Sequence, residues 1–158
     1  MSWTRYCRDA VATERAGETF AAVLERGDVV LLTGTLGAGK TTFTKGVARG
    51  LGVVERVTSP TFTMVRQHRC STNRGIVTLH HCDVYRVTSL GEVLDLALGE
   101  LVEEEGVALV EWGELAASLF GRDVLTVTFS IDDENGRTIV VGGALSCARA
   151  QELEAWAQ

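Results

Sequence analysis

The sequence predicts an α/β fold with a mixed, partly antiparallel sheet, and three observations support this prediction. A continuous apolar run at residues 28–32 leads into a glycine-rich loop and a helical pattern, the strand–loop–helix order of a phosphate-binding unit. A second apolar run at 107–110 is typical of a strand that helices cover on both faces. Residues 125–131 instead alternate apolar and polar side chains, as half-exposed antiparallel strands do. We therefore expect a three-layer P-loop NTPase-like domain.

The remaining elements follow from periodicity and turn residues. Thr13 is expected to cap the first helix and Gly27 to end it. Residues 133–136, Asp-Glu-Asn-Gly, are expected to form a hairpin turn. The predicted helices cover 13–25, 42–49, 90–101, 115–120 and 147–156, and further strands cover 62–65, 76–79 and 138–141, of which the first two are candidates for a hairpin. No linker or repeat interrupts the chain, so one domain over residues 1–158 is expected.

Length and composition agree with one core and no membrane segment. At 158 residues and 46% hydrophobic content, the chain can bury roughly two-thirds of its unfolded surface. No apolar stretch approaches the roughly 20 residues of a membrane span, and the N-terminal residues lack a signal-peptide core. We expect a soluble cytoplasmic protein. The four cysteines lack CxxC spacing, so we expect reduced and mostly buried thiols.

The charge balance argues against direct nucleic-acid binding. The formal net charge is −6, whereas binding to a phosphate backbone depends on clustered Lys and Arg. A local basic stretch, residues 66–74, is interpreted as a solvated loop because Ser, Thr, Asn and Gly accompany its charges. Any link to RNA is therefore expected to run through a partner protein.

The glycine-rich loop carries the main chemical signal. Residues 34–42 read Gly-Thr-Leu-Gly-Ala-Gly-Lys-Thr-Thr and satisfy the GxxxxGKT pattern. Its glycines let successive backbone N–H groups point into one concavity at the start of a helix, which binds phosphate. Lys40 adds a compact positive charge, and the Thr41 hydroxyl can coordinate Mg²⁺. The sequence therefore predicts a nucleotide-phosphate site.

Two acidic residues stand at the ends of predicted strands. Asp83 follows one apolar segment and Glu111 directly follows 107–110, so both carboxylates can reach the sheet edge where open α/β folds bind ligands. The alternative is that each faces solvent. A transition-metal cluster of His80, His81, Cys82 and Asp83 is disfavoured, because neighbouring side chains on a strand point to opposite faces.

Four motifs in order resemble those of the bacterial TsaE (YjeE) family of tRNA threonylcarbamoyladenosine biosynthesis ATPases. They are LGAGKTTF, then SPTF, then the H-x-D-x-Y-R of residues 81–86, then Glu111-Trp112. The resemblance implies an ATPase acting with TsaD and TsaB. These proteins install threonylcarbamoyl on the adenosine next to the anticodon of tRNAs reading codons that begin with A. TsaD is the implied transferase, and ATP binding and hydrolysis by the present chain sustain turnover of the complex.

The resemblance also implies site residues. Thr41 and Glu111 hold Mg²⁺, and Asp83 lies in the outer shell of the metal or orients water; with Lys40, the two acids are the candidate catalytic residues. Thr13 and Arg137 lie near the nucleotide. The ATP phosphates are assigned to Gly37, Ala38, Gly39, Lys40, Thr41 and Thr42. Family members commonly carry an acidic residue where this chain has Thr35, so that side chain is given no role.

The expected activity is weak hydrolysis that partners stimulate. The sequence offers no assured arginine finger, and NTPases without one can be slower by about 10³ to 10⁵. A small-molecule kinase is the main alternative, and a non-catalytic adaptor gated by nucleotide binding is another. A regulatory GTPase is less favoured because no N-K-x-D motif occurs.

Overall fold

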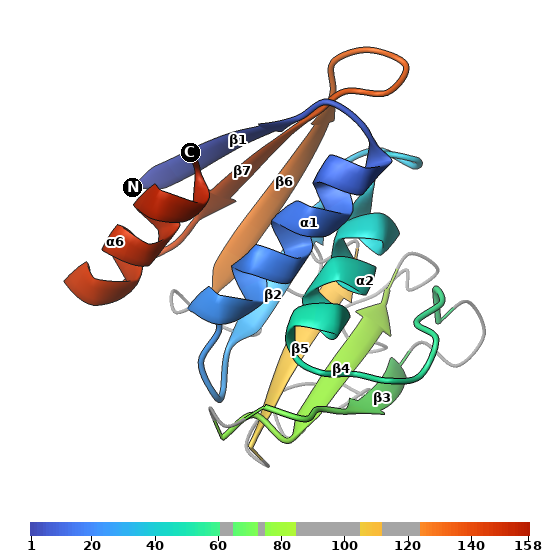
Figure 1. Cartoon of the computed structure of the whole chain (residues 1–158), viewed down its shortest axis with the longest axis vertical. Helices are drawn as coiled ribbons and strands as arrows, with labels where there is room; N and C mark the ends of the chain where they lie inside the picture. The colour runs from blue at the N-terminus through green and yellow to red at the C-terminus, as the bar shows by residue number, and fades with distance from the viewer. Residues whose placement is uncertain (61–64, 73–74, 85–104, 112–123) are drawn as a thin grey trace.

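The computed structural model of the chain describes residues 1–60, 65–72, 75–84, 105–111 and 124–158. Seven strands of this part form one mixed sheet in the order β1-β7-β6-β2-β5-β4-β3 (Figure 1). In chain order they are β1 (Ser2–Cys7), β2 (Val29–Thr33), β3 (Val65–Arg69), β4 (Thr78–Asp83), β5 (Gly106–Glu111), β6 (Leu125–Ile131) and β7 (Arg137–Gly142). The predicted α/β class with a partly antiparallel sheet is confirmed.

The centre of the sheet is parallel and carries the site. β2 pairs in parallel with β5 on one side and with β6 on the other, and β4 continues the parallel set beyond β5. β2 and β5 are buried along most or all of their length, which is why both read as apolar runs. The carboxyl ends of these four strands therefore meet at one edge of the sheet.

The sheet margins differ from the expectation in three respects. β1 was not predicted; it pairs antiparallel with β7, and only two of its side chains are buried. β3 occupies residues 65–69, so the first part of the basic stretch at 66–74 is an edge strand rather than a loop. Its polar side chains are mostly exposed, so the apolar pattern could not reveal it. β4 begins and ends later than the predicted strand 76–79 but pairs antiparallel with β3, as a hairpin does.

The first helix begins earlier than predicted. Helix α1 (Ala10–Phe20) starts after Asp9, whose side chain accepts a hydrogen bond of 2.8 Å from the Ala12 N–H. Asp9 is therefore the N-cap, and the prediction that Thr13 caps the helix is wrong. Thr13 lies inside α1, buried, and its hydroxyl donates to the Asp9 carbonyl over 3.2 Å. A short 3₁₀ turn, η1 (Ala21–Val23), follows.

Two further helices have the predicted positions. Helix α2 (Lys40–Gly50) follows β2 and the glycine-rich loop, and helix α6 (Cys147–Trp156) forms the tail. Figure 1 shows α1 and α2 side by side over one face of the central strands, with α6 beside α1 near β1. Aromatic rings connect these elements: Phe43 of α2 contacts both Phe20 and Phe129, and Trp156 contacts Phe20, with centroids 5.3–5.9 Å apart.

The tail helix is fastened to the core by polar contacts. Arg149 forms a two-pronged pair with Asp28, with N···O distances of 2.5 and 3.2 Å. The Trp156 indole N–H donates to the Ala16 carbonyl over 2.9 Å, and Arg5 of β1 donates to the Trp156 carbonyl. These contacts link α6 to the loop that precedes β2, to α1 and to β1.

Backbones of α1 and α2 touch where glycine removes the side chain. A Cβ atom built on Gly46 of α2 would lie 1.9 Å from the Glu14 carbonyl oxygen of α1, and one on Gly17 would lie 2.1 Å from the Phe43 carbonyl oxygen. No side chain fits at either position. Two glycines therefore set the distance between these helices, and with it the place of the loop that precedes α2.

Several predictions concern residues that the structure does not describe. The helices predicted at 90–101 and 115–120 and most of the strand predicted at 62–65 lie outside the described residues. None of the described helices has the length and hydropathy needed to cross a membrane. Of the cysteines, Cys7 and Cys82 are buried and Cys147 is exposed, and all are free thiols. Burial raises the pKa of the Cys82 thiol to about 12.

Replacement of Gly46 by alanine should destabilise the fold. The new methyl group meets backbone rather than a flexible side chain, so we expect a loss of about 2–3 kcal/mol in the free energy of unfolding, despite a helix-propensity gain of about 1 kcal/mol. Urea unfolding followed by circular dichroism measures this. Lys45→Ala, at the exposed neighbouring position, should stay within about 0.5 kcal/mol of wild type. Equal stability of both variants would contradict the packing argument.

Candidate functional site

The glycine-rich loop and the start of α2 form the centre of the site. Gly37 and Gly39 have φ angles of +79° and +103°, a left-handed conformation that favours glycine. Gly39 occupies the N-cap position of α2 without a side-chain cap. The first backbone N–H groups of a helix lack intrahelical acceptors and carry the positive end of the helix dipole. The loop therefore has the local structure of a phosphate-binding turn.

Lys40 is held inside this turn. Its side chain is buried, and Nζ donates hydrogen bonds of 2.5 Å to the Gly34 carbonyl and 3.1 Å to the Thr35 carbonyl. Thr35 therefore contributes to this turn through its backbone carbonyl. The ammonium group is thus fixed within the loop whose backbone would surround the phosphates.

Thr41, the residue after Lys40, contacts Glu111 of β5. The Thr41 hydroxyl donates to Glu111 Oε1 over 3.0 Å, and Glu111 is 2% exposed. Glu111 is the last residue of β5 and pairs with Leu32 of β2 on one side and with Asp83 of β4 on the other. The parallel register thus places both predicted acids at one sheet edge, directly beside the phosphate loop.

The donor set fits a magnesium ion. A threonine hydroxyl and a carboxylate supply hard oxygen ligands, and Mg²⁺ typically takes one or two protein carboxylates together with substrate phosphates. Within the described ranges no group of three or more His, Cys, Asp and Glu side chains could hold a metal. Thr41 and Glu111 would hold the ion, and Asp83, half-buried beside Glu111, has the position of an outer carboxylate.

His81 also belongs to this cluster, which was not predicted. Its ring is fully buried, and Nε2 lies 3.3 Å from Glu111 Oε2. The objection to a metal cluster concerned adjacent residues on a strand, but His81 and Asp83 are two residues apart and share a face. The sequence did contain a signal for this cluster. His81 and Asp83 are two residues apart on one strand, and that strand was expected to lie near the strand that ends at Glu111.

A pocket lies beside the phosphate loop. A cavity of about 130 Å³ is lined by residues of α1, the loop, α2 and the β6–β7 hairpin. The predicted nucleotide-binding residues among them are Thr13, Gly37, Gly39, Thr42 and Arg137. The structure therefore brings Thr13 and Arg137 to the same pocket, although more than a hundred residues separate them in the sequence.

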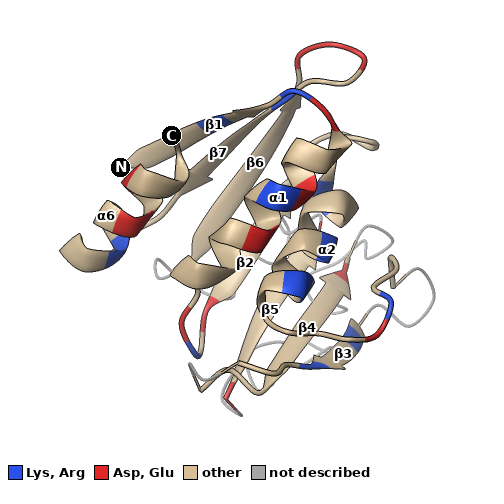
Figure 2. Cartoon of the chain, in the orientation of Figure 1, with Lys and Arg blue, Asp and Glu red and all other residues tan. Residues whose placement is uncertain are grey.

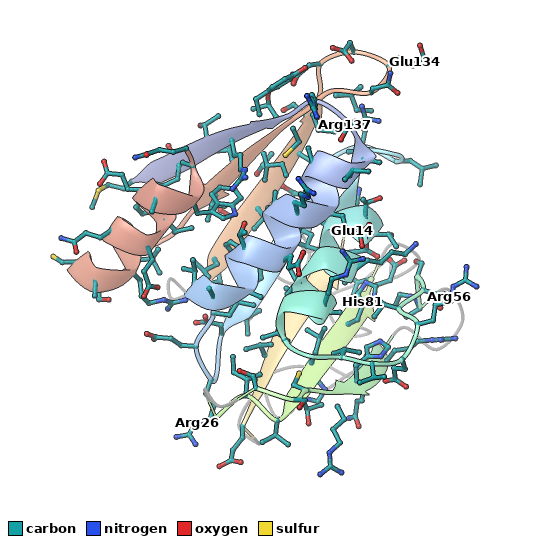
Figure 3. The ribbon with its side chains drawn as sticks, viewed as in Figure 1. Glu14, Arg26, Arg56, His81, Glu134 and Arg137 are labelled. Atoms are coloured by element: carbon teal, nitrogen blue, oxygen red, sulfur yellow. The ribbon has the colours of Figure 1, made fainter. Side chains whose placement is uncertain are left out.

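Hydrogen bonds within the β6–β7 hairpin surround Arg137. The Asp133 carboxylate accepts hydrogen bonds from the Gly136 N–H (2.7 Å) and the Asn135 N–H (2.9 Å), and these bonds lower the pKa of Asp133. Arg137 Nη2 donates to the Gly37 carbonyl over 3.2 Å. Figure 3 shows Arg137 and Glu134 at the end of the molecule where this hairpin meets the start of α1. The hairpin therefore contacts the phosphate loop directly.

Charges of both signs are spread over the described surface. Figure 2 shows acidic residues in the β6–β7 hairpin, charges of both signs along α1, and basic residues along α2 and near β3. Along the helices the signs pair: Arg49 of α2 contacts Glu14 and Glu18 of α1. Part of the basic charge on α2 is therefore paired with acidic residues of α1.

Comparison with known proteins identifies the family. Residues 7–139 match the family described as "Threonylcarbamoyl adenosine biosynthesis protein TsaE". The chain is 42% identical over 134 residues to the tRNA threonylcarbamoyladenosine biosynthesis protein TsaE of Treponema pallidum (strain Nichols), covering 85% of this chain and 96% of that protein. The TsaE protein of Bacillus subtilis (strain 168) is 41% identical over 133 residues, which are 83% of this chain and 80% of the relative.

The solved structures agree. The crystal structure of YdiB from Bacillus subtilis superimposes with a TM-score of 0.71 at 30% sequence identity, covering 99% of this chain and 94% of that one. Of the motifs that suggested the family, residues 61–62, 85–86 and 112 lie outside the described part, whereas the phosphate loop, His81, Asp83 and Glu111 lie within it. The chain belongs to the TsaE family of threonylcarbamoyl adenosine biosynthesis proteins.

Proposed function

We propose that this protein binds and hydrolyses ATP and thereby sustains threonylcarbamoyladenosine formation on tRNA together with TsaD and TsaB. The modified base is the adenosine next to the anticodon of tRNAs reading codons that begin with A. TsaD performs the transfer, and tRNA is reached only through the complex. The observation that carries the proposal is the Thr41–Glu111 pair at the start of α2, in a chain of the TsaE family. The proposed location is the cytoplasm.

Each site residue has a part in the proposed hydrolysis. The backbone of residues 37–42 and the Lys40 ammonium bind the β- and γ-phosphates. Mg²⁺, held by Thr41 and Glu111, would neutralise phosphate charge. Asp83 orients the attacking water, whose oxygen bonds to the γ-phosphorus while the bond from that phosphorus to the bridging oxygen of ADP breaks. ADP, inorganic phosphate and one proton result.

The second half of the site binds the rest of the nucleotide. Thr13 and Arg137 line the pocket beside the loop, and the Arg137 guanidinium already contacts the Gly37 carbonyl. Because Arg137 contacts the phosphate loop of its own chain, we assign it to nucleotide binding. A transition-state arginine would come from a partner, so the isolated protein should hydrolyse ATP slowly and the complex faster.

Reconstitution tests the proposal directly. Purified TsaC-type synthase, TsaB and TsaD with tRNA and ATP are incubated with and without this protein, and nucleosides are analysed by mass spectrometry. Multiple-turnover threonylcarbamoyladenosine only in its presence supports the proposal. Transfer of labelled γ-phosphate to a metabolite instead of to water would indicate a small-molecule kinase, and full dependence without hydrolysis would indicate a nucleotide-gated adaptor.

Lys40→Ala should abolish nucleotide-dependent function while the fold persists. The variant removes the ammonium group that faces the loop interior, and loss of one such electrostatic contact typically costs about 10²–10³ in rate. ATP turnover and modified-nucleoside yield measure the effect. Lys45→Ala, an exposed lysine on the same helix, is the matched control. Retained modification with Lys40→Ala would refute a role for ATP at this loop.

Glu111→Gln should reduce hydrolysis more than ATP binding. The amide keeps the size of the buried side chain but loses the charge that would hold the metal, so we expect at least about a 100-fold lower turnover, the equivalent of several kcal/mol. Phosphate release and fluorescent-nucleotide binding in EDTA separate the two effects. Glu152→Gln, on the exposed side of α6, serves as control. Unchanged turnover would reject the metal-binding role of Glu111.

Arg137→Ala should weaken ATP binding and leave the phosphate loop folded. A hydrogen bond to a charged group contributes about 1.5–3 kcal/mol, so the dissociation constant for ATP should rise by about 10- to 100-fold. Calorimetric titration with a non-hydrolysable ATP analogue measures it. Arg8→Ala, an exposed arginine just before α1, should leave the affinity within about twofold, because exposed charges contribute little. An equal effect of both variants would place the nucleotide elsewhere.

A further inference from the structure

His81 is a buried side chain that the proposed hydrolysis does not use. It lies in β4 and is 0% exposed, and Figure 3 labels it near the carboxyl end of that strand, beside α2 in this view. Neither ring nitrogen forms a well-oriented hydrogen bond with a described residue. Buried polar atoms nearly always have a partner, so a histidine in this state at the edge of a binding site needs an explanation.

The sheet register aims this ring at Glu111. His81 pairs with Leu109 and Asp83 pairs with Glu111 across the parallel β4–β5 ladder. His81 and Glu111 are therefore diagonal neighbours on one face, close enough for long side chains to touch. Nε2 of His81 lies 3.3 Å from Oε2 of Glu111, and this carboxylate oxygen is an acceptor within its reach.

The two oxygens of Glu111 face different groups. Oε1 accepts the Thr41 hydroxyl over 3.0 Å, while Oε2 faces His81. Both carboxylate and imidazole are almost fully buried, so neither is in contact with bulk water. The carboxylate consequently lies between the helix that follows the phosphate loop, to which it is hydrogen-bonded, and the neighbouring strand.

We propose that His81 is a positioning residue that orients the Glu111 carboxylate for the divalent cation accompanying ATP. This inference rests on the proposed function. Nε2 lies 3.3 Å from Oε2, so in the nucleotide-bound protein a small rotation of the ring would let Nε2 donate to Oε2 and direct Oε1 toward Thr41 and the phosphate loop. Side chains that orient metal ligands typically change metal affinity or activity about 10- to 100-fold when removed. The expected defect is in cation affinity, whereas contacts between the loop and the phosphates remain.

A pair of substitutions separates this role from packing. His81→Leu keeps an apolar side chain of similar size and removes the donor. His81→Gln places an amide N–H near the position of Nε2. The control is His68→Leu, because His68 is also buried, lies on the neighbouring strand β3 and contacts a glutamate, Glu55, outside the site.

Binding of Mn²⁺ to each variant saturated with ADP is followed by electron paramagnetic resonance, and ADP affinity is measured in EDTA. We expect His81→Leu to bind Mn²⁺ about 10- to 100-fold more weakly, with ADP affinity in EDTA within about twofold, and His81→Gln to recover most of the loss. His68→Leu should match wild type. Equal losses in Mn²⁺ and ADP affinity, or a glutamine variant no better than leucine, would overturn the inference.

A replacement variant and two wild-type outcomes distinguish failure of this inference from failure of the proposed function. Should His81→Leu fail to fold by circular dichroism, His81→Asn replaces it, because its shorter amide does not reach Glu111; Mn²⁺ affinity equal to that of His81→Gln would then overturn the inference. Wild-type protein that binds no nucleotide would refute the proposed function, and the inference with it. Wild-type binding of Mn²⁺ and ADP with unaffected His81 variants would refute the inference alone.

Discussion

The contact between the backbones of α1 and α2 is the constraint on which the site depends. A Cβ at Gly46 or Gly17 would lie about 2 Å from a carbonyl oxygen of the other helix, so the two helices can lie this close only with glycine at both positions. Because α2 begins at the end of the phosphate loop, its distance from α1 also determines where that loop lies. The same contact between the helices places Thr13 of α1 beside Gly39. A Cβ atom built on Gly39 would lie 3.3 Å from the methyl carbon of Thr13.

The parallel register provides the second half of this arrangement. β5 lies between β2 and β4, so Glu111 stands between the strand that leads into the phosphate loop and the strand that carries Asp83. Helix packing positions Thr41 on one face of the sheet, and strand pairing positions Glu111 within the sheet. The 3.0 Å hydrogen bond between these two side chains joins α2 to β5. Any change that shifts α2 relative to the sheet would therefore alter this contact together with the core packing of Phe43.

The elements that could be predicted from sequence carry a strong local pattern. The α2 and α6 helices, the buried strands and the β6–β7 hairpin have such patterns, through apolar runs, alternation or an Asp-Glu-Asn-Gly turn. β1 and β3 lie at the sheet edges, where many side chains face solvent, and their pairing partners are distant in sequence or polar. Their existence follows from long-range hydrogen bonding, which a local window does not contain. The N-cap error at Thr13 has a similar origin, since Asp9 precedes the apolar pattern by several residues.

The site residues divide in the same way, into those with a local sequence pattern and those that only long-range contacts bring together. Gly37 to Thr42 could be predicted because they are contiguous, and the acids because they end apolar strands. The contact of Arg137 with Gly37 spans 100 residues, and His81 reaches Glu111 only through the β4–β5 register. The contiguous half has the loop structure that P-loop proteins share. The hairpin and β4 supply the assembled half, so the features that distinguish this protein from other P-loop proteins are expected among the residues that only the fold brings together.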